Sequence, residues 1–236
     1  MEEERIRFRE IFYKLNTGDL IKRNSVCDEA LRYIEEVTNS DLKEGMCEVI
    51  VFLLIHLGRS EEAKHIIDIM VSSINISTIK SSFFARIEYS KNINDGYLNL
   101  EKVVSEAIEF AKKNELKEAE CSFVIENAKI LIKGQRYDEA ITKLSGIANI
   151  AETTNNNVFL ATSKYYMGLC LYFLGKTGLA NEFFLQASEI ASIEHNFDIA
   201  ILSEMMRANI YAQDNNAEIS KNILQHCMRN FSMTLC

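Results

Sequence analysis

The sequence contains no proline and no tryptophan, and it has only nine glycines in 236 residues. Average usage would place about 12 prolines and about 17 glycines in a chain of this length. The missing proline excludes polyproline linkers, collagen-like segments and proline-rich turns, and it removes the strongest helix breaker from every position. Because 47% of the residues are apolar and 25% are charged, the chain is too apolar for general disorder. We therefore expect a folded, all-helical protein.

Long apolar runs are also missing. The longest strictly apolar run, Val49 to Ile55, falls far short of the roughly 18 residues that a membrane helix requires. The first five residues carry acids where a signal peptide needs bases followed by an apolar stretch. We expect no membrane partner and a cytoplasmic location.

Residue patterns that mark metal sites and active sites are missing as well. The six cysteines form no Cys-x-x-Cys pair and the four histidines form no i,i+4 pair, so we expect reduced thiols, no metal and no cofactor. No Gly-x-Ser-x-Gly, His-Glu-x-x-His or Gly-x-Gly-x-x-Gly motif occurs, and we expect no enzymatic activity. The net charge of −8 repels phosphate backbones, which makes nucleic acid a poor candidate partner.

Five of the nine glycines fall on a regular lattice. Gly18, Gly58, Gly96, Gly134 and Gly175 are 40, 38, 38 and 41 residues apart, and Asn215 follows 40 residues later. Each lies between two apolar-periodic stretches, where a helix ends and the chain turns back on itself. The lattice predicts helical hairpins with a period near 40.

The helix after each turn should carry small and apolar residues at i, i+4 and i+7, so that it packs closely on the helix before it. Four such triplets occur: Ala63, Ile67, Met70; Ala140, Leu144, Ile147; Ala180, Phe184, Ala187; and Ser220, Leu224, Cys227. The predicted hairpins span residues 1–40, 41–78, 79–118, 119–158, 159–198 and 199–236. Because one hairpin cannot bury its apolar face alone, we expect a single right-handed α-solenoid domain over 1–236.

The best repeat covers residues 163–175, followed by Ala180, Phe184 and Ala187, and it resembles the tetratricopeptide repeat. The terminal proline of that motif is absent throughout, and the period is nearer 40 than 34. Both features are found in one branch of these proteins, the peptide-pheromone receptors of Gram-positive bacteria and their phages (the Rap, Rgg, PlcR, NprR and AimR group). The resemblance implies a tetratricopeptide-like fold and a role in quorum sensing.

Within that branch, residues 125–131 and 134–140 resemble the sensor domain of PlcR-type regulators, and the likeness runs from Glu118 to Ala212. In those receptors an asparagine on the concave face of a first helix clamps the backbone of a short peptide. Asn127 stands at that place, and the equivalent position one repeat earlier is near Arg86, where the family commonly has another asparagine. The DNA-reading members carry about sixty residues of helix-turn-helix before the repeats. Here the lattice begins at once, so we expect no direct DNA binding.

In a solenoid of this kind the first helix of each hairpin lines the concave wall. The candidate peptide-binding residues on that register are Arg86, Tyr89, Asn127, Lys129, Lys133, Tyr165, Tyr172, Asn209 and Gln213. The asparagines would hold a peptide backbone, the cations a carboxylate, and the tyrosines apolar side chains. Each also has a plainer interpretation, because asparagine and lysine on helices are mostly solvated and tyrosines at helical spacing usually fill the core between repeats.

Together these patterns favour a non-enzymatic regulator that recognises a short peptide or protein segment in its concave groove and transmits that binding to a protein partner. One rival is a generic adaptor or scaffold that holds a folded protein. Another is a Rap-like modulator of a response regulator. The apolar C-terminal residues Phe231, Met233 and Leu235 predict a homodimer contact through that end.

Overall fold

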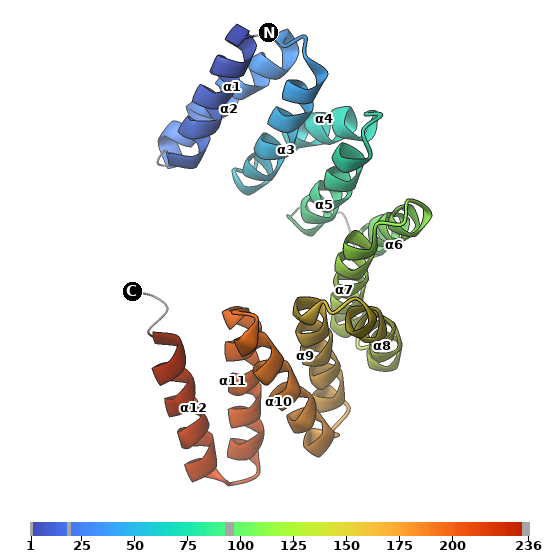
Figure 1. Cartoon of the computed structure of the whole chain (residues 1–236), viewed down its shortest axis with the longest axis vertical. Coiled ribbons are helices and arrows are strands. Elements are labelled where there is room, and N and C mark those ends of the chain that lie inside the picture. The colour runs from blue at the N-terminus through green and yellow to red at the C-terminus, as the bar shows by residue number, and fades with distance from the viewer. Residues whose placement is uncertain (1, 18–19, 93–96, 233–236) are drawn as a thin grey trace. The chain divides into compact units, whose positions relative to one another are not determined.

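The computed structural model describes residues 2–17, 20–92 and 97–232, which form twelve α-helices and no strand (Figure 1). The all-α fold class is confirmed. The chain divides into two compact units, Met1–Lys113 and Asn114–Cys236. Each unit is described by itself below, and the single-domain arrangement stays a prediction.

The first unit contains six helices. These are α1 (Glu2–Thr17), α2 (Leu20–Glu36), α3 (Ser40–His56), α4 (Ser60–Val71), α5 (Ile76–Asn92) and α6 (Tyr97–Lys113). Their core includes the fully buried Tyr33, Ile50 and Leu54. Arg59, directly before α4, forms ion pairs with Asp28 on α2 and with Glu62 on α4. These ion pairs link α2 to the start of α4.

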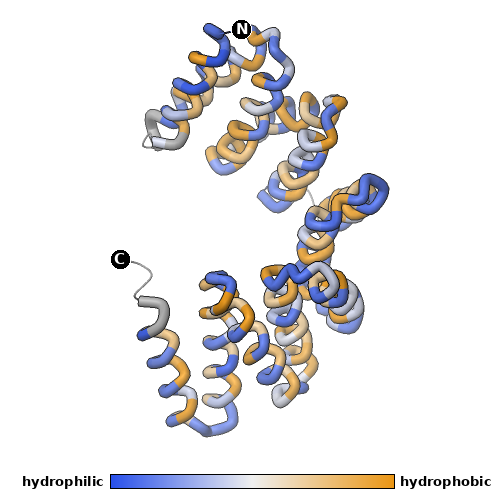
Figure 2. The backbone as a smooth tube through the Cα atoms, in the orientation of Figure 1, coloured by the Kyte–Doolittle hydropathy of each residue, from blue (hydrophilic) through white to orange (hydrophobic). Residues whose placement is uncertain are grey.

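The second unit also contains six helices. These are α7 (Lys117–Lys133), α8 (Tyr137–Thr153), α9 (Asn157–Phe173), α10 (Thr177–Ile193), α11 (Phe197–Gln213) and α12 (Ala217–Ser232). We call α7, α9 and α11 the first helices and α8, α10 and α12 the second helices of this unit. Figure 2 shows hydrophobic and hydrophilic residues alternating along each of them, as amphipathic helices require.

A three-residue connection of one design precedes each helix of the second unit. The middle residue of each connection has positive φ, and these residues are Glu115, Gln135, Asn155, Gly175, His195 and Asn215. At the turn into α8, for example, the backbone N–H of Arg136 donates to the carbonyl of Leu131 at 2.8 Å, which closes the end of α7. A 17-residue helix and a three-residue connection produce a 20-residue step, and two steps give the period of 40.

Three lattice glycines, Gly58, Gly134 and Gly175, lie between helices as predicted, but they differ in backbone conformation. Gly58 and Gly175 both have φ of 74°. Gly134, however, has φ of −81° and ends α7 without leaving the ordinary region, and it is Gln135 that adopts φ of 59°. Gly18 and Gly96 lie outside the described residues.

The second helices bury most of their predicted triplets. Ala140, Leu144, Ala180, Phe184 and Ala187 are all fully buried. Leu224 on α12 is the exception, with 41% of its surface exposed. Leu144 and Phe184 are covered by the helices on both sides of them along the chain, whereas among the described residues α12 has no helix after it.

Candidate functional site

A side-chain cluster joins two first helices of the second unit. The phenol oxygen of Tyr172 on α9 accepts hydrogen bonds from the amide of Asn209 at 3.0 Å and from the amide of Gln213 at 2.6 Å, both on α11. Asn209 and Gln213 are exposed and Tyr172 is half-buried. Three of the candidate residues are therefore brought together on one surface, which we call the first-helix face.

The ammonium of Lys129 on α7 contacts both a carboxylate and an aromatic ring. Its Nζ lies 2.6 Å from a carboxylate oxygen of Glu126 and 5.5 Å from the ring centroid of Tyr166 on α9. Burial disfavours the charge of Lys129, but the hydrogen bond and the negative charge of Glu126 outweigh it and raise the pKa of the ammonium. Lys133, one turn further on, is exposed and has no hydrogen-bond or ion-pair partner among the described residues.

Tyr165 belongs to the core of the second unit. Only 7% of its surface is exposed, and its ring centroid lies 5.8 Å from that of Phe184. Burial raises the pKa of its phenol. The plainer interpretation, that this tyrosine fills the space between helices, holds for Tyr165.

Asn127 is buried on a different side of α7 from Lys129. It is 3% exposed, and its amide oxygen accepts no hydrogen bond from the described residues. One period later the same register holds Met167, which lies in an apolar core cluster with Ala148. Residues two apart on a helix point about 200° away from each other, so Asn127 and Lys129 do not line one groove. The expectation that all the candidates share one concave wall is therefore wrong for Asn127.

Arg86 and Tyr89 lie on α5, in the first unit. The Arg86 guanidinium is 2.7 Å from the carboxylate of Glu106 on α6 and 5.2 Å from the ring centroid of Phe83. Tyr89 packs against the core cluster of that unit. Both residues have structural roles inside the first unit, and the first-helix face belongs to the second unit.

Apolar residues that the sequence analysis did not select share the first-helix face. Leu202 and Met205 precede Asn209 by seven and four residues on α11, which is the spacing of one helix face. They are 42% and 52% exposed. Leu202, Met205 and Asn209 stand at i, i+3 and i+7, and this spacing could have identified the two apolar residues. Selecting polar and aromatic candidates alone left them out.

Among the described residues there is no cluster of three histidine, cysteine or acidic side chains placed to hold a metal ion. No helix in the described part of the chain is long and apolar enough to cross a membrane. The side chain of Phe231 and residues Met233 and Leu235, which carried the homodimer prediction, lie outside the described residues.

Comparisons with known proteins support the fold. No family model matches the chain, and no curated protein sequence matches it. Among solved structures, the tetratricopeptide-containing signal-transduction ATPase with numerous domains from Pyrococcus horikoshii superposes with a TM-score of 0.76 and 14% identity, over 97% of this chain and 35% of that one. The chain therefore spans about a third of that ATPase.

Two Rap-type structures superpose over most of their own length. The apo form of RapI has a TM-score of 0.73 and 11% identity, with 97% of each chain covered. Aspartyl phosphate phosphatase F from Bacillus subtilis has a TM-score of 0.72 and 10% identity, over 97% of this chain and 70% of that one. The protein thus has the helical-repeat fold of tetratricopeptide proteins, Rap proteins among them.

Proposed function

We propose that the protein is a non-enzymatic regulator that binds a short peptide on the first-helix face of its second unit and passes the signal to a protein partner. The observation that carries the proposal is the Tyr172, Asn209 and Gln213 cluster. Each amide donates to the phenol and keeps its carbonyl oxygen available, so a peptide N–H can be accepted without leaving a buried polar group unpaired.

Other residues of the first-helix face offer contacts to a peptide's apolar and acidic side chains. Leu202 and Met205 offer exposed apolar surface beside Asn209. Lys133 offers an unpaired cation for a carboxylate. Polar groups that fix the backbone, with apolar surface between them, are what an extended peptide requires.

Signal transfer follows from the repeat construction. Each hairpin of a repeat array contacts only its neighbours, so the interfaces are small. A ligand that touches α7, α9 and α11 at once would favour one arrangement of these helices and thereby alter what a partner protein meets. Of the solved structures with this fold, one is a Rap protein complexed with competence and sporulation factor; its TM-score is 0.57 and its identity is 16%, over 98% of this chain and 77% of that one.

The test is native mass spectrometry of the protein purified gently from its own cells. A co-purified species of roughly five to ten residues supports the proposal, and the double variant Asn209→Ala, Gln213→Ala should lose it. The matched control is Asn149→Ala, which removes an exposed amide from α8, away from the first-helix face. A wild-type chain that carries no peptide, while an intact second protein co-purifies and survives the double substitution, would contradict the proposal.

The second candidate function is an adaptor that holds a folded protein. The observation that favours it is the exposed apolar surface of Leu202 and Met205, which a protein surface can cover as well as a peptide can. An adaptor would lose its partner on Leu202→Glu but keep it on the double amide substitution. This difference separates the two candidates.

A further inference from the structure

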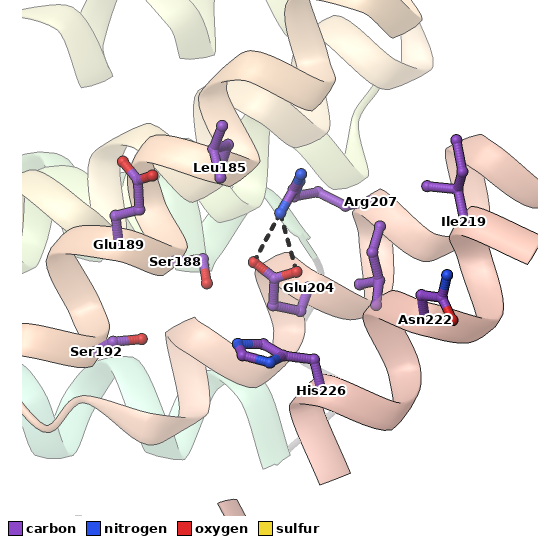
Figure 3. A pocket seen from close by; sticks show the side chains of 10 residues that line it. Leu185, Ser188, Glu189, Ser192, Glu204, Arg207, Ile219, Asn222 and His226 are labelled. Carbon is purple, nitrogen blue, oxygen red and sulfur yellow. Dashed lines mark hydrogen bonds and ion pairs between the residues drawn. The ribbon is translucent and has the colours of Figure 1, made fainter. Parts of the chain in front are cut away.

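A cavity of about 720 Å³ lies among α10, α11 and α12, on the other side of α11 from the first-helix face (Figure 3). Arg207 lines the cavity while Asn209 lies on the first-helix face, and residues two apart point in nearly opposite directions. The volume falls in the range of sites that hold organic ligands. The cavity is therefore a second site, separate from the proposed peptide face.

The floor of the cavity is an ion pair that is mostly buried. Nη1 of Arg207 lies 3.0 Å from each carboxylate oxygen of Glu204, and the two side chains are 15% and 11% exposed. Nε of Arg207 donates to the amide oxygen of Asn181 at 3.3 Å. Nη2 has no partner among the described residues, so two N–H groups of the guanidinium remain available to a ligand.

The α10 wall of the cavity adds oxygen atoms. Ser188 is only 6% exposed, and its hydroxyl has no hydrogen-bond partner among the described residues. Figure 3 shows this hydroxyl directed into the space beside Glu204, with Ser192 and Glu189 on the same wall. No protein group competes for this hydroxyl, so it can accept a hydrogen bond from a ligand that enters the cavity.

The preceding repeat fills the corresponding space with apolar side chains. Forty residues earlier, Ala148, Met167 and Phe183 occupy the positions of Ser188, Arg207 and Ile223. Those three side chains meet in one apolar core cluster. In the last repeat Ile223 replaces the aromatic ring of Phe183, and the Glu204–Arg207 ion pair stands where Met167 lies one repeat earlier. The corresponding space is therefore open and polar.

From this arrangement we infer that the cavity binds an ammonium group on an aliphatic stem, as in the lysine side chain of a polypeptide. Glu189 and Glu204 supply two negative charges against the one positive charge of Arg207. The hydroxyls of Ser188 and Ser192 accept hydrogen bonds from an ammonium, which has three N–H donors and no acceptor.

The remaining walls fit the rest of a lysine residue. Leu185, Ile219 and Ile223 present apolar surface to the methylene stem. The free Nη2 of Arg207 donates to a carbonyl oxygen of the ligand's own main chain. A free aliphatic diamine has the same ammonium and stem but no carbonyl, so it would leave Nη2 unused and bind more weakly than a lysine peptide.

The test uses amide NMR spectra of the isotope-labelled full chain, titrated with acetyl-Gly-Lys-Leu-amide. The control peptide carries norleucine for lysine, which replaces the ammonium with a methyl group. We expect the lysine peptide to shift amide signals around Ser188, Glu204 and His226, and the norleucine peptide to bind at least about tenfold more weakly, as expected for a lost charged hydrogen bond. A parallel titration with 1,5-diaminopentane distinguishes a free amine from a peptide-borne lysine.

Three variants of the cavity and one control variant complete the test. Ser188→Ala and Ile223→Phe install residues of the size that the preceding repeat accommodates, so the fold should be retained while binding is lost. Glu189→Gln should weaken binding about tenfold, whereas Glu152→Gln, which removes an exposed carboxylate from α8 outside the cavity, should not.

Equal binding of the lysine and norleucine peptides would overturn the inference. So would shifts confined to Tyr172, Asn209 and Gln213, because the peptide would then occupy the first-helix face. Diamine binding as tight as that of the peptide would keep the ammonium site and assign it to a free amine. Because the cavity and the first-helix face report through different amide signals, failure of one site does not imply failure of the other.

Discussion

Gly168 on α9 lies against the ring of Phe184 on α10 so closely that a Cβ atom at position 168 would be 2.8 Å from Cε1 of the ring. Phe184 is fully buried, with no room to withdraw. The contact explains why a glycine, which is unfavourable in a helix interior, stands in the middle of α9. The packing of α9 on α10 at this point therefore depends on the absence of a side chain at Gly168.

We therefore expect Gly168→Ala to destabilise the protein by about 1–3 kcal/mol, because the overpacking outweighs the gain of about 1 kcal/mol in helix propensity. Urea denaturation followed by circular dichroism measures the change. The matched control is Gly146→Ala on α8, where a Cβ would meet nothing within 4 Å. That substitution should stabilise the protein by about 0.5–1 kcal/mol, and a loss of stability in both variants would contradict the steric explanation.

The connections between helices provide a second prediction. Gln135 has φ of 59° and Gly175 has φ of 74°, at the same place in successive hairpins. An L-residue with a side chain pays about 1 kcal/mol for this conformation, whereas glycine adopts it freely. Gln135→Gly should raise the free energy of unfolding by up to about 1 kcal/mol, and Gly175→Ala should lower it by a similar amount. Opposite signs in the two urea midpoints are the expected result.

The Glu204–Arg207 ion pair supports a third prediction. In Arg207→Met the Glu204 carboxylate, in a residue that is 9% exposed, loses its compensating charge. We expect a loss of about 1–3 kcal/mol of stability. The double variant Glu204→Lys, Arg207→Met reproduces the Lys164 and Met167 combination of the preceding repeat and should recover most of the loss. Lys133→Met, which removes an exposed cation, is the control and should change stability by no more than about 0.5 kcal/mol.

The buried cysteines predict how stability depends on pH. Burial raises the pKa of the Cys47 and Cys170 thiols to about 11, above their ordinary value of 9.0. Between about pH 9 and pH 11 the unfolded chain therefore loses these protons before the folded chain does, and stability falls as pH rises. Thermal melting across this range measures the slope, which should be shallower in the double variant Cys47→Ala, Cys170→Ala.

The same burial predicts slow thiol chemistry. Cys27, Cys47, Cys121, Cys170 and Cys227 are all buried in the folded chain. Because the thiolate is the reactive form, iodoacetamide at pH 8 should label these five residues only as fast as the protein unfolds. Labelling of any of them at the rate of a free thiol in the native protein would contradict the burial.

The fold could be predicted from the sequence because its signals are local. The absence of proline, the glycines near a 40-residue spacing, and triplets such as Ala180, Phe184 and Ala187 each depend only on spacing along the chain. Helical hairpins follow from such spacing because neighbours in sequence are also neighbours in space. The left-handed turn at Gln135 was missed because glycine is the usual signal for that conformation, and here the glycine stands one residue earlier.

Which residues lie on the ligand-accessible surfaces could not be predicted from the sequence. Spacing identifies a buried face, but it does not show what covers each side of a helix. Asn127 and Lys129 read as members of one wall, yet they point in nearly opposite directions. Ile223 lines the cavity beside Glu204 and Arg207, at the position where Phe183 packs against an apolar core cluster one repeat earlier. The sequence by itself determined a tetratricopeptide-like array, and packing between non-adjacent side chains decided which of its polar residues are available to a ligand.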